Sequence, residues 1–349
     1  MVEKQRQGAR FDTRTKLLQW PERLVEFKAG LVPEPLLCEL YPTYACQLRC
    51  PWCDMGHTLL DKTDQDGHMP TALLLDVVRQ LRLEGLQAIN WSGGGEPTLH
   101  PVILEAVRLS KSLGMSNGMF TNGMWDHDEK LYEQLPPELT WVRFSLNSGF
   151  AKTLKGAMRV LKLKEEHGWE TGVGLGVVVS GREDQHQFSM LVRLMLDAAS
   201  KPFDYIQLRP DHLAKPHEVL KAQENAEELI NRVGLGGDAR VYMTSYKFSD
   251  GANWSRHYDK CYCPRFILTI GADGQVWHCP DMTGKDPKQW AWGSLAERPL
   301  SAILCSLEVR ERIEGVDVHR CPPLCKGHET NKALWDMLNP APESHPGHL

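Results

Sequence analysis

The chain has 349 residues, a hydrophobic content of 42%, a charged content of 24% and a formal net charge of −5. This composition is ordinary for a soluble globular protein, and the length suits one large α/β domain with a small appendage. The acidic balance weakens the case for a nucleic-acid substrate. Because the sequence has neither an apolar signal-peptide core nor an apolar run of membrane length, we expect a cytoplasmic protein with no membrane partner.

Short apolar runs alternate with longer helical periods from about residue 36 and predict βα units around a parallel sheet. Residues 1–36 precede them as an N-terminal extension with a helix between Pro21 and Gly30. The six expected strands are PLLCELY, QAINWS, NGMFTNG, WVRFSLNS, GVGLGVVVS and DYIQLRP. The helices expected between them cover residues 71–84, 101–113, 126–135, 151–167 and 186–199. Six such units fit a partial (β/α)6 TIM-like barrel over residues 37–212.

The remaining third of the chain is expected to have a different organisation. Residues 213–250 are predicted to be a linker with one helix, HEVLKAQENAEELINRV, and a glycine-rich break. Residues 251–336 begin afresh with cysteines and predict a small C-terminal α+β iron–sulfur domain. The proline- and glycine-containing end, residues 337–349, is predicted to be a disordered tail.

Three of the ten cysteines, Cys46, Cys50 and Cys53, stand close together in the run CQLRCPWCD. Thiolates at this spacing can hold three irons of a [4Fe–4S] cube and leave the fourth iron open to a small molecule. The structural alternatives are a zinc site that lacks one ligand or a group of buried thiols. Zinc commonly takes a CxxC pair together with a second, distant pair of ligands, so the spacing favours the cluster.

A second motif, WSGGGEP at residues 91–97, ends the second predicted strand. Together the two motifs resemble the radical SAM superfamily, whose signature is a CxxxCxxC loop followed by a GGEP strand end. The resemblance implies the partial barrel and the binding of S-adenosylmethionine (SAM) to the open iron. It also implies reductive cleavage of SAM to a 5′-deoxyadenosyl radical, which takes a hydrogen atom from a carbon of the substrate.

The resemblance further implies that SAM contacts lie at the carboxyl ends of the strands, where barrels of this kind carry their functional groups. Glycines at such a position let backbone carbonyls approach a ligand closely. The expected cofactor-binding residues are Trp52, Gly94, Gly95, Glu96, Ser145, Asn147, Gln207 and Arg209. A mere tight turn at the glycines, an ordinary polar strand end at 145–147 and a structural ion pair at Arg209 remain open. No side chain is assigned as a catalytic acid or base.

Five further cysteines lie near the C-terminus, around a predicted hairpin at residues 272–274. Their pattern is similar to the SPASM and shorter twitch extensions of radical SAM enzymes, which hold auxiliary [4Fe–4S] clusters. The resemblance implies four ligands, Cys261, Cys279, Cys321 and Cys325, with Cys263 as the alternative to Cys261. A structural zinc site, with His278 or His328 in place of a thiolate, is the other possibility.

The substrate is the least constrained part of this interpretation. The resemblance favours oxidation or rearrangement of a small molecule of amino-sugar or natural-product type, with a flavodoxin- or ferredoxin-type electron donor. A peptide substrate is less favoured, because the segment before Cys46 is expected to be too short for a leader-binding domain. The runs FDTRTKLLQWPERLVEFKAG and CKGHETNKAL are also similar to phage radical SAM proteins, some of which rearrange amino-acid-modified thymine in DNA hypermodification. A non-catalytic iron–sulfur or zinc protein is the rival from a different class.

Overall fold

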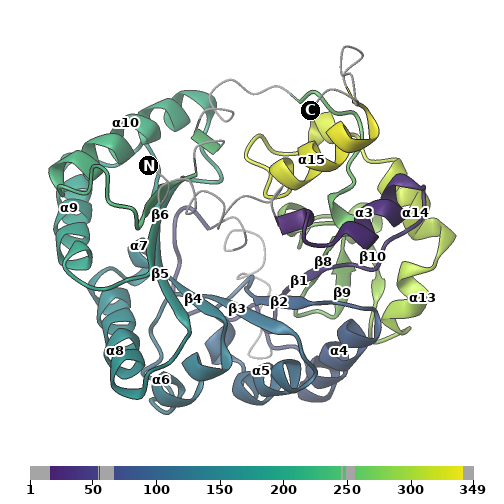
Figure 1. The fold of residues 1–349 in the computed structure, drawn as a ribbon, viewed down its shortest axis with the longest axis horizontal. Helices are drawn as coiled ribbons and strands as arrows, with labels where there is room; N and C mark the ends of the chain where they lie inside the picture. The colour runs from purple at the N-terminus through teal and green to yellow at the C-terminus, as the bar shows by residue number, and fades with distance from the viewer. Residues whose placement is uncertain (1–15, 54, 56–66, 245–246, 249–255, 341–349) are drawn as a thin grey trace.

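The computed structural model describes residues 16–53, 55, 67–244, 247–248 and 256–340 (Figure 1). Within these residues the strands form one ten-stranded sheet in the order β10-β9-β8-β1-β2-β3-β4-β5-β6-β7. Strands β1 to β7 run parallel to their neighbours, and β8 also pairs in parallel with β1. The hairpin partners β9 and β10 are antiparallel. The sheet curls into an open barrel with helices on its outer face, which confirms the predicted fold class.

The bounds of the strands follow the apolar runs of the sequence. They are β1 Leu37–Leu40, β2 Ala88–Trp91, β3 Ser116–Thr121, β4 Trp141–Ser145, β5 Gly172–Val179, β6 Tyr205–Pro210, β7 Val241–Met243, β8 Ile267–Ile270, β9 Gln275–Trp277 and β10 Ala291–Ser294. Every residue of β5 is buried, as expected for a parallel strand covered on both faces.

The α-helices are α3 Pro21–Lys28, α4 Thr71–Leu83, α5 Ile103–Ser112, α6 Leu131–Gln134, α7 Leu146–Gly149, α8 Ala151–His167, α9 Gln185–Ala199, α10 Pro216–Arg232, α12 Pro287–Trp290, α13 Leu300–Leu304, α14 Leu307–Glu314 and α15 His328–Leu338. Short 3-10 helices cover Pro97–Leu99, Pro136–Glu138, Cys263–Arg265, Pro280–Met282 and Val318–Arg320. None of the helices in the described segments is long and apolar enough to cross a membrane.

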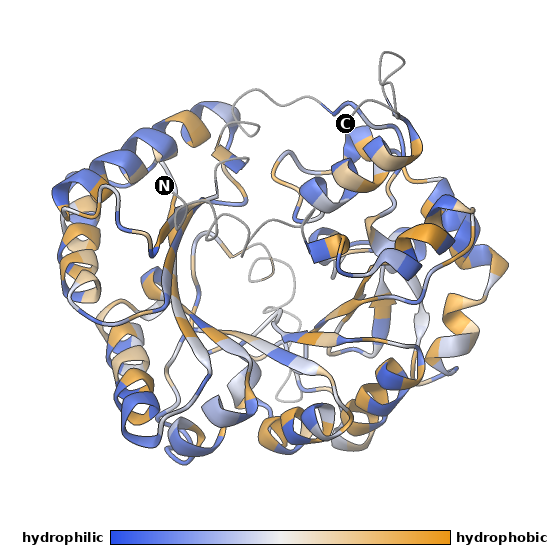
Figure 2. Cartoon of the chain, viewed as in Figure 1, coloured by the Kyte–Doolittle hydropathy of each residue, from blue (hydrophilic) through white to orange (hydrophobic). Residues whose placement is uncertain are grey.

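The outer helices bury one apolar stripe each against the sheet, as the hydropathy colouring of Figure 2 shows. On α8 this stripe includes Leu154, Ala157 and Val160, and the structure has the helix over the predicted residues, 151–167. The predicted helix over 126–135 is shorter, since α6 begins only at Leu131. The Asp128 carboxylate accepts a hydrogen bond from the Lys130 amide at 3.1 Å, a local turn that competes with helix.

The described part of the segment 213–250, expected to be a linker, contributes to the barrel itself. Helix α10 buries Val219, Ala222 and Leu229, and β7 pairs with β6. The strand has only three residues, all half-buried, so its sequence carries no alternation from which it could be recognised.

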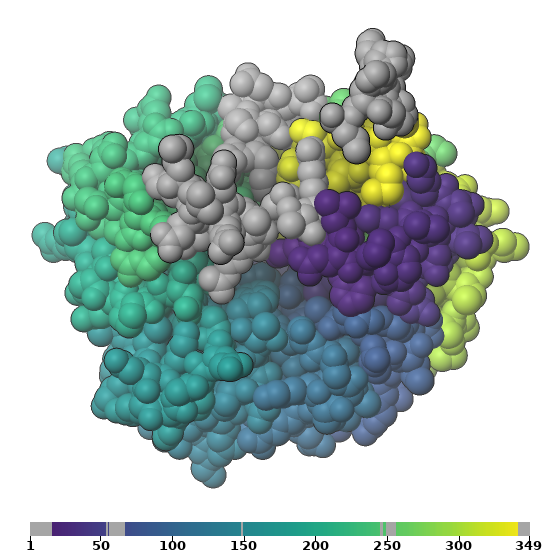
Figure 3. Space-filling model, in the orientation of Figure 1, coloured from purple at the N-terminus to yellow at the C-terminus, as the bar shows by residue number. Residues whose placement is uncertain are grey.

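The C-terminal third also shares the barrel's sheet and core rather than forming a separate unit. Leu268 and Ile270 of β8 belong to the same buried cluster as Leu40 and Ile89. Helices α3 and α15 meet in a second, smaller cluster that contains Leu24, Phe27, Phe266 and Leu334. Figure 3 shows the N-terminal segment (purple) and the C-terminal segment (yellow) side by side. Helix α15 extends to Leu338, two residues into the predicted tail, and residues 341–349 lie outside the described residues.

Candidate functional site

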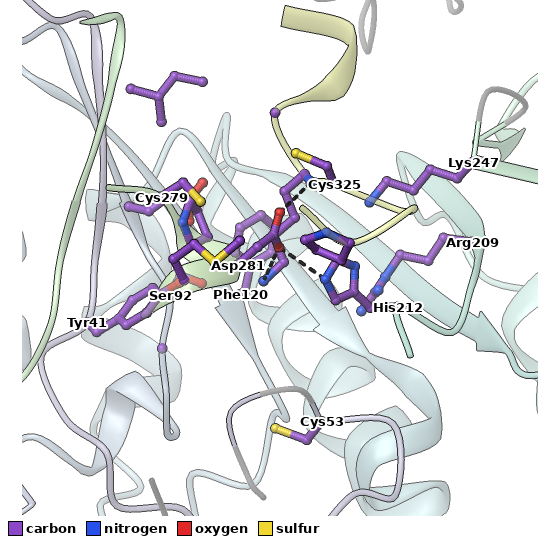
Figure 4. A pocket seen from close by; sticks show the side chains of 18 of the residues that line it. Tyr41, Cys53, Ser92, Phe120, Arg209, His212, Lys247, Cys279, Asp281 and Cys325 are labelled. Atoms are coloured by element: carbon purple, nitrogen blue, oxygen red, sulfur yellow. Dashed lines mark hydrogen bonds and ion pairs between the residues drawn. The ribbon is translucent and has the colours of Figure 1, made fainter. Parts of the chain in front are cut away.

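Both groups of cysteines line a single cavity of about 440 Å³ at the carboxyl ends of the barrel strands (Figure 4). This arrangement joins two motifs that lie more than two hundred positions apart in the sequence. The cysteines on the cavity wall are Cys46, Cys50, Cys53, Cys261, Cys263, Cys279, Cys321 and Cys325.

The first cysteine loop is supported by the glycine motif. The Glu96 amide donates to the Ala45 carbonyl at 2.9 Å, and a Cβ atom on Gly95 would lie only 2.1 Å from that carbonyl oxygen. Only glycine permits this close approach. Burial raises the pKa of the Cys46 thiol to about 11, and a bound metal would oppose this shift because it takes the thiolate form.

Glu96 is buried, and its carboxylate accepts four hydrogen bonds. The donors are Thr98 N at 3.3 Å, Thr98 Oγ1 at 2.7 Å, Thr121 Oγ1 at 2.7 Å and Asn122 N at 2.7 Å. Burial raises the pKa of Glu96, and these donors partly oppose the rise. The side chain therefore ties the end of β2 to the end of β3, a structural role that accompanies any cofactor contact.

Of the predicted SAM-contacting residues, six line the cavity and two do not. Those on the wall are Trp52, Gly95, Glu96, Ser145, Gln207 and Arg209. Gly94 is buried outside the lining. The Asn147 amide donates to the Val178 carbonyl at 2.5 Å and accepts from the Val178 amide at 2.8 Å. Asn147 thus continues the β4–β5 ladder past Ser145, and this pairing occupies the side chain that the sequence suggested for the cofactor.

A row of polar side chains crosses the barrel interior and fixes the orientation of Gln207. Arg143 of β4 donates to the Gln207 side-chain oxygen, and Gln207 Nε2 donates to Thr244 Oγ1 at 3.1 Å. The Arg143 guanidinium also lies 4.2 Å from the centre of the Phe120 ring. These contacts hold β3, β4 and β6 together where the cavity opens.

The five C-terminal cysteines are close enough to affect one another. Burial raises the pKa of Cys261 well above its usual value, and the neighbouring thiols Cys263, Cys325 and Cys321 raise it further. A Cβ atom on Gly327 would lie 2.8 Å from Cys263 Sγ and 4.0 Å from Cys325 Sγ, so a glycine leaves room for the two sulfurs. Both Cys261 and Cys263 reach the cavity. This set of converging thiols fits a thiolate-ligated iron–sulfur cluster.

Hydrogen bonds from distant segments enclose this second group. The Arg256 guanidinium donates to the carbonyls of Val318, of Cys321 at 3.3 Å and of Pro322 at 2.8 Å. Asn331 donates to the Lys260 carbonyl at 2.8 Å and accepts from the amides of Tyr262 and Cys263. These contacts tie the segment that carries Cys261 and Cys263 to the segment around Cys321 and to α15.

The two histidines considered as zinc ligands, His278 and His328, have different surroundings in the structure. His328 Nδ1 lies 2.9 Å from the Tyr258 hydroxyl, to which it is hydrogen-bonded. His278 lines the cavity, and burial lowers its pKa to about 4. Among the described residues, no group of three or more His, Cys, Asp or Glu side chains is arranged around a single-ion site.

Sequence reasoning missed a charged group at the centre of the cavity. Asp281 Oδ1 lies 3.1 Å from His212 Nε2, and Asp281 Oδ2 accepts from the Lys326 amide at 2.8 Å. Burial would raise the pKa of Asp281, but His212 and then Lys326 lower it more, so it lies well below its usual range. Burial, followed by the Arg209 charge, lowers the pKa of Lys247 to about 8.

The positions of these residues relative to the cysteines offered a partial signal. Asp281 stands two residues after Cys279, and Lys326 directly follows Cys325. His212 follows the end of β6, the strand that carries Gln207 and Arg209. Lys247 had no such signal, because it lies on a short segment with no recognisable motif.

The family model described as the radical SAM superfamily matches residues 40–185. The chain contains a radical SAM domain. The matched residues run from the end of β1 to the start of α9 and include the first cysteine loop and the glycine motif.

Two curated proteins are similar to part of this chain. A tungsten-containing aldehyde ferredoxin oxidoreductase cofactor-modifying protein from Pyrococcus furiosus is 30% identical over 172 residues, 44% of this chain and 46% of its own length. An S-adenosylmethionine-dependent nucleotide dehydratase from Flammeovirga pacifica is 34% identical over 115 residues, 32% of this chain and 38% of its own length. The chain therefore spans less than half the length of these relatives.

Among solved structures, Streptococcus suis SuiB bound to its precursor peptide SuiA has a TM-score of 0.61 and 14% identity. The match covers 89% of this chain and 75% of SuiB. At this identity the likeness concerns the fold, and it extends beyond the radical SAM domain into the C-terminal third.

Proposed function

We propose that the chain is a radical SAM enzyme that acts on a small organic molecule with the help of an auxiliary [4Fe–4S] cluster. The observation that carries the proposal is the single cavity lined by both groups of cysteines. Two separate iron–sulfur sites on opposite faces would not support the same proposal.

The residues would share the work as follows. The cluster that binds SAM would be held by Cys46, Cys50 and Cys53. The auxiliary cluster would be held by the C-terminal cysteines, with either Cys261 or Cys263 as one of its ligands. Once bound and reduced, the first cluster and SAM supply a 5′-deoxyadenosyl radical, which removes a hydrogen atom from the substrate. The ligands of the auxiliary cluster would then be Cys261 or Cys263 with Cys279, Cys321 and Cys325.

The chain's own side chains position the reactants. Trp52, Ser145 and Arg209 lie on the wall of the cavity, where they orient the adenosyl or substrate groups. Gln207 is held by Arg143 and Thr244, so it presents a fixed amide to the cavity. Preorganised polar groups of this kind reduce the cost of orienting a substrate.

Oxidation or rearrangement of the substrate is the proposed net reaction, with a flavodoxin- or ferredoxin-type protein as electron donor. The nucleotide dehydratase relative makes nucleotides useful probes beside amino sugars. Peptides, suggested by the name of the SuiA complex, and DNA with amino-acid-modified thymine are the alternatives to be tested.

Anaerobic 5′-deoxyadenosine formation by the reconstituted enzyme tests the proposal. We expect release in the presence of SAM and dithionite, stimulated by one class among nucleotides, amino sugars, peptides and modified DNA. The variant C46A/C50A/C53A should lose at least about 100-fold of this activity, because no protein ligand for the SAM-binding cluster remains. Cys305→Ala is the matched control, since this cysteine is exposed and absent from the cavity lining. Equal release by the triple variant and wild type would contradict the proposal.

A further inference from the structure

The first cysteine loop packs on a hairpin that belongs to the C-terminal third of the chain. Tyr41 and Tyr44 precede the cysteines of this loop, and Met55 follows them. These three side chains form a buried cluster with Ala272, which lies in the turn between β8 and β9. Cys53 packs against the same cluster. Both ends of the loop therefore rest on a segment from the other half of the chain.

Polar atoms converge at Gly271, where the hairpin begins to turn. A Cβ atom at this position would lie 2.2 Å from Tyr44 Oη, 2.5 Å from Asp273 Oδ1 and 2.8 Å from Trp277 Nε1. The Tyr44 hydroxyl thus faces the Asp273 carboxylate, and burial followed by this charge raises the pKa of the hydroxyl. We call the three hairpin residues, Gly271, Asp273 and Trp277, the hairpin seat. It leaves no room for a side chain at its glycine.

The hairpin's own contacts fix the seat. The Asp273 carboxylate accepts a hydrogen bond from the Gln275 amide at 3.1 Å and another from Trp277 Nε1 at 3.4 Å. The Trp277 side chain is buried, and Cys279 follows it two residues later. The tyrosine of the first loop is therefore received by a preformed surface that also leads into the second cysteine group.

The backbone beside Tyr44 is held from two other directions. The Tyr44 amide donates to the Gly67 carbonyl at 2.6 Å, and the Ala45 carbonyl accepts from the Glu96 amide at 2.9 Å. Cys46 is the next residue. Because the chain between the tyrosine ring and this cysteine is braced, a displacement of the ring is passed on to the loop instead of being absorbed by it.

We propose that Tyr44 is a positioning residue for the SAM site, and that the hairpin seat sets how the first cysteine loop presents its cluster to SAM. This inference rests on the proposed function and adds a regulation of the same site by the C-terminal third. The effect is separate from the auxiliary cluster, since the seat contains none of the cysteines proposed as its ligands.

A competing explanation is that the contact at the seat only adds stability. In that case a change at the seat lowers the thermal midpoint and the iron content, but the clusters that remain respond to SAM as they do in wild type. A positioning contact instead weakens the response to SAM of each intact cluster. The two explanations therefore differ in the KM for SAM and in the spectrum of the cluster, both taken per intact cluster.

Gly271→Ala is the deciding variant, because it removes no polar group and its new Cβ atom has to displace the Tyr44 hydroxyl. The anaerobically reconstituted, reduced holoenzyme is titrated with SAM, and the change that SAM causes in the EPR spectrum is measured per reduced cluster. Release of 5′-deoxyadenosine gives KM and kcat for SAM. We expect a KM at least about tenfold above wild type, a smaller change in kcat, and an EPR change that needs correspondingly more SAM. Gly236→Ala is the control, since its Cβ atom meets no neighbour closer than 3.8 Å.

The double variant Gly271→Ala/Tyr44→Phe tests whether the effect passes through Tyr44. Phenylalanine keeps the ring in its apolar cluster and removes the oxygen nearest to the new Cβ atom. The double variant should therefore bind SAM more tightly than Gly271→Ala alone, a non-additive result. Tyr44→Phe by itself should raise the KM less than Gly271→Ala does.

Three results overturn the inference. They are an equal KM and EPR response in wild type and Gly271→Ala, a loss confined to stability and iron content, and a double variant that binds SAM no better than Gly271→Ala. Because the EPR titration needs no turnover, absence of 5′-deoxyadenosine release in wild type would overturn the proposed function separately.

Discussion

The two cysteine groups face the same cavity, but the chain holds them in different ways. The first is a short loop after β1, braced by backbone contacts between Ala45 and the glycine motif. The second collects sulfurs from several segments and is enclosed by Arg256 and Asn331. The first group, Cys46 to Cys53, would leave one iron of its cluster open, and we call it the open site; a local sequence motif marks it. The second group, Cys261 to Cys325, is the enclosed site, and it is built by tertiary contacts. The following substitutions test this contrast.

The largest expected difference concerns iron. Reconstituted wild type should bind about eight irons per chain, in two four-iron clusters. The variant C46A/C50A/C53A should lose about four of them together with SAM cleavage. Cys279→Ala should also lose about four irons but keep SAM cleavage measurable, as should Cys261→Ala if that residue is the ligand. Iron analysis and 5′-deoxyadenosine release check this, and Cys263→Ala compares the two candidate ligands. Loss of SAM cleavage in Cys279→Ala would show that the two groups are not independent.

Gly95→Ala should damage the open site. The new Cβ atom would meet the Ala45 carbonyl oxygen at 2.1 Å, and because this neighbour is backbone, the loop itself has to move. We expect a cost of about 3 kcal/mol and at least about tenfold less 5′-deoxyadenosine, with the auxiliary cluster retained. Gly236→Ala is the control, since its nearest neighbour, Asn231 Oδ1, would be 3.8 Å away. Normal SAM cleavage in Gly95→Ala would mean that the glycine contact does not position the loop.

Arg256→Ala should affect the enclosed site instead. It removes the donors to the carbonyls of Val318, Cys321 and Pro322, and leaving such groups unpaired costs about 2 kcal/mol. We expect a lower thermal midpoint and partial loss of the auxiliary cluster while SAM cleavage persists. Arg310→Ala, at an exposed position of α14, is the matched control. If Arg256→Ala keeps the wild-type iron content of the auxiliary cluster, the cysteine group forms its site without the hydrogen bonds from Arg256.

The smallest effect lies outside both groups, at Asp238. The hydrogen bond from the Arg240 side chain lowers the pKa of this carboxyl, so the pair stabilises the protein above the unfolded-state pKa and ceases to do so as pH falls through the folded-state value. Asp238→Asn should cost less than about 1 kcal/mol. The difference in unfolding free energy between wild type and Asp238→Asn should stay constant between about pH 6 and about pH 8. The pKa of Asp238 lies below that range in both the folded and the unfolded state. Anaerobic thermal melts at the two ends of the range measure it, and a difference that changes with pH would contradict this assignment.

The sequence alone was sufficient to predict the helices and strands whose residues follow a regular hydrophobic pattern. The period of α8 and the apolar run of β5 predicted both elements closely, and the spacing of Cys46, Cys50 and Cys53 predicted one cluster of thiols. These signals are local, so they can be read without knowing which segments meet.

The rest of the site depends on contacts between distant segments. Asn147 was expected near the cofactor, yet its amide pairs with the backbone of Val178, and nothing in its neighbourhood of the sequence records that partner. Lys247 reaches the cavity only because β7 joins the sheet beside β6. Three half-buried residues are too few to predict such a strand.

The pairing of β8 with β1 has a consequence for how the chain folds. The Tyr41 amide, just before the first cysteine loop, donates to the Ile270 carbonyl at 2.9 Å. The earliest strand of the barrel thus acquires its second neighbour from a segment 230 positions later in the chain, as the pairing of Leu37 with Ile267 shows. During synthesis β1 remains an edge with unpaired backbone groups until residues 267–270 have left the ribosome. Such a long sequence separation slows folding. We therefore expect final ordering of the first cysteine loop to be a late event in maturation, and a nascent chain that pauses before β8 to expose a template for aggregation.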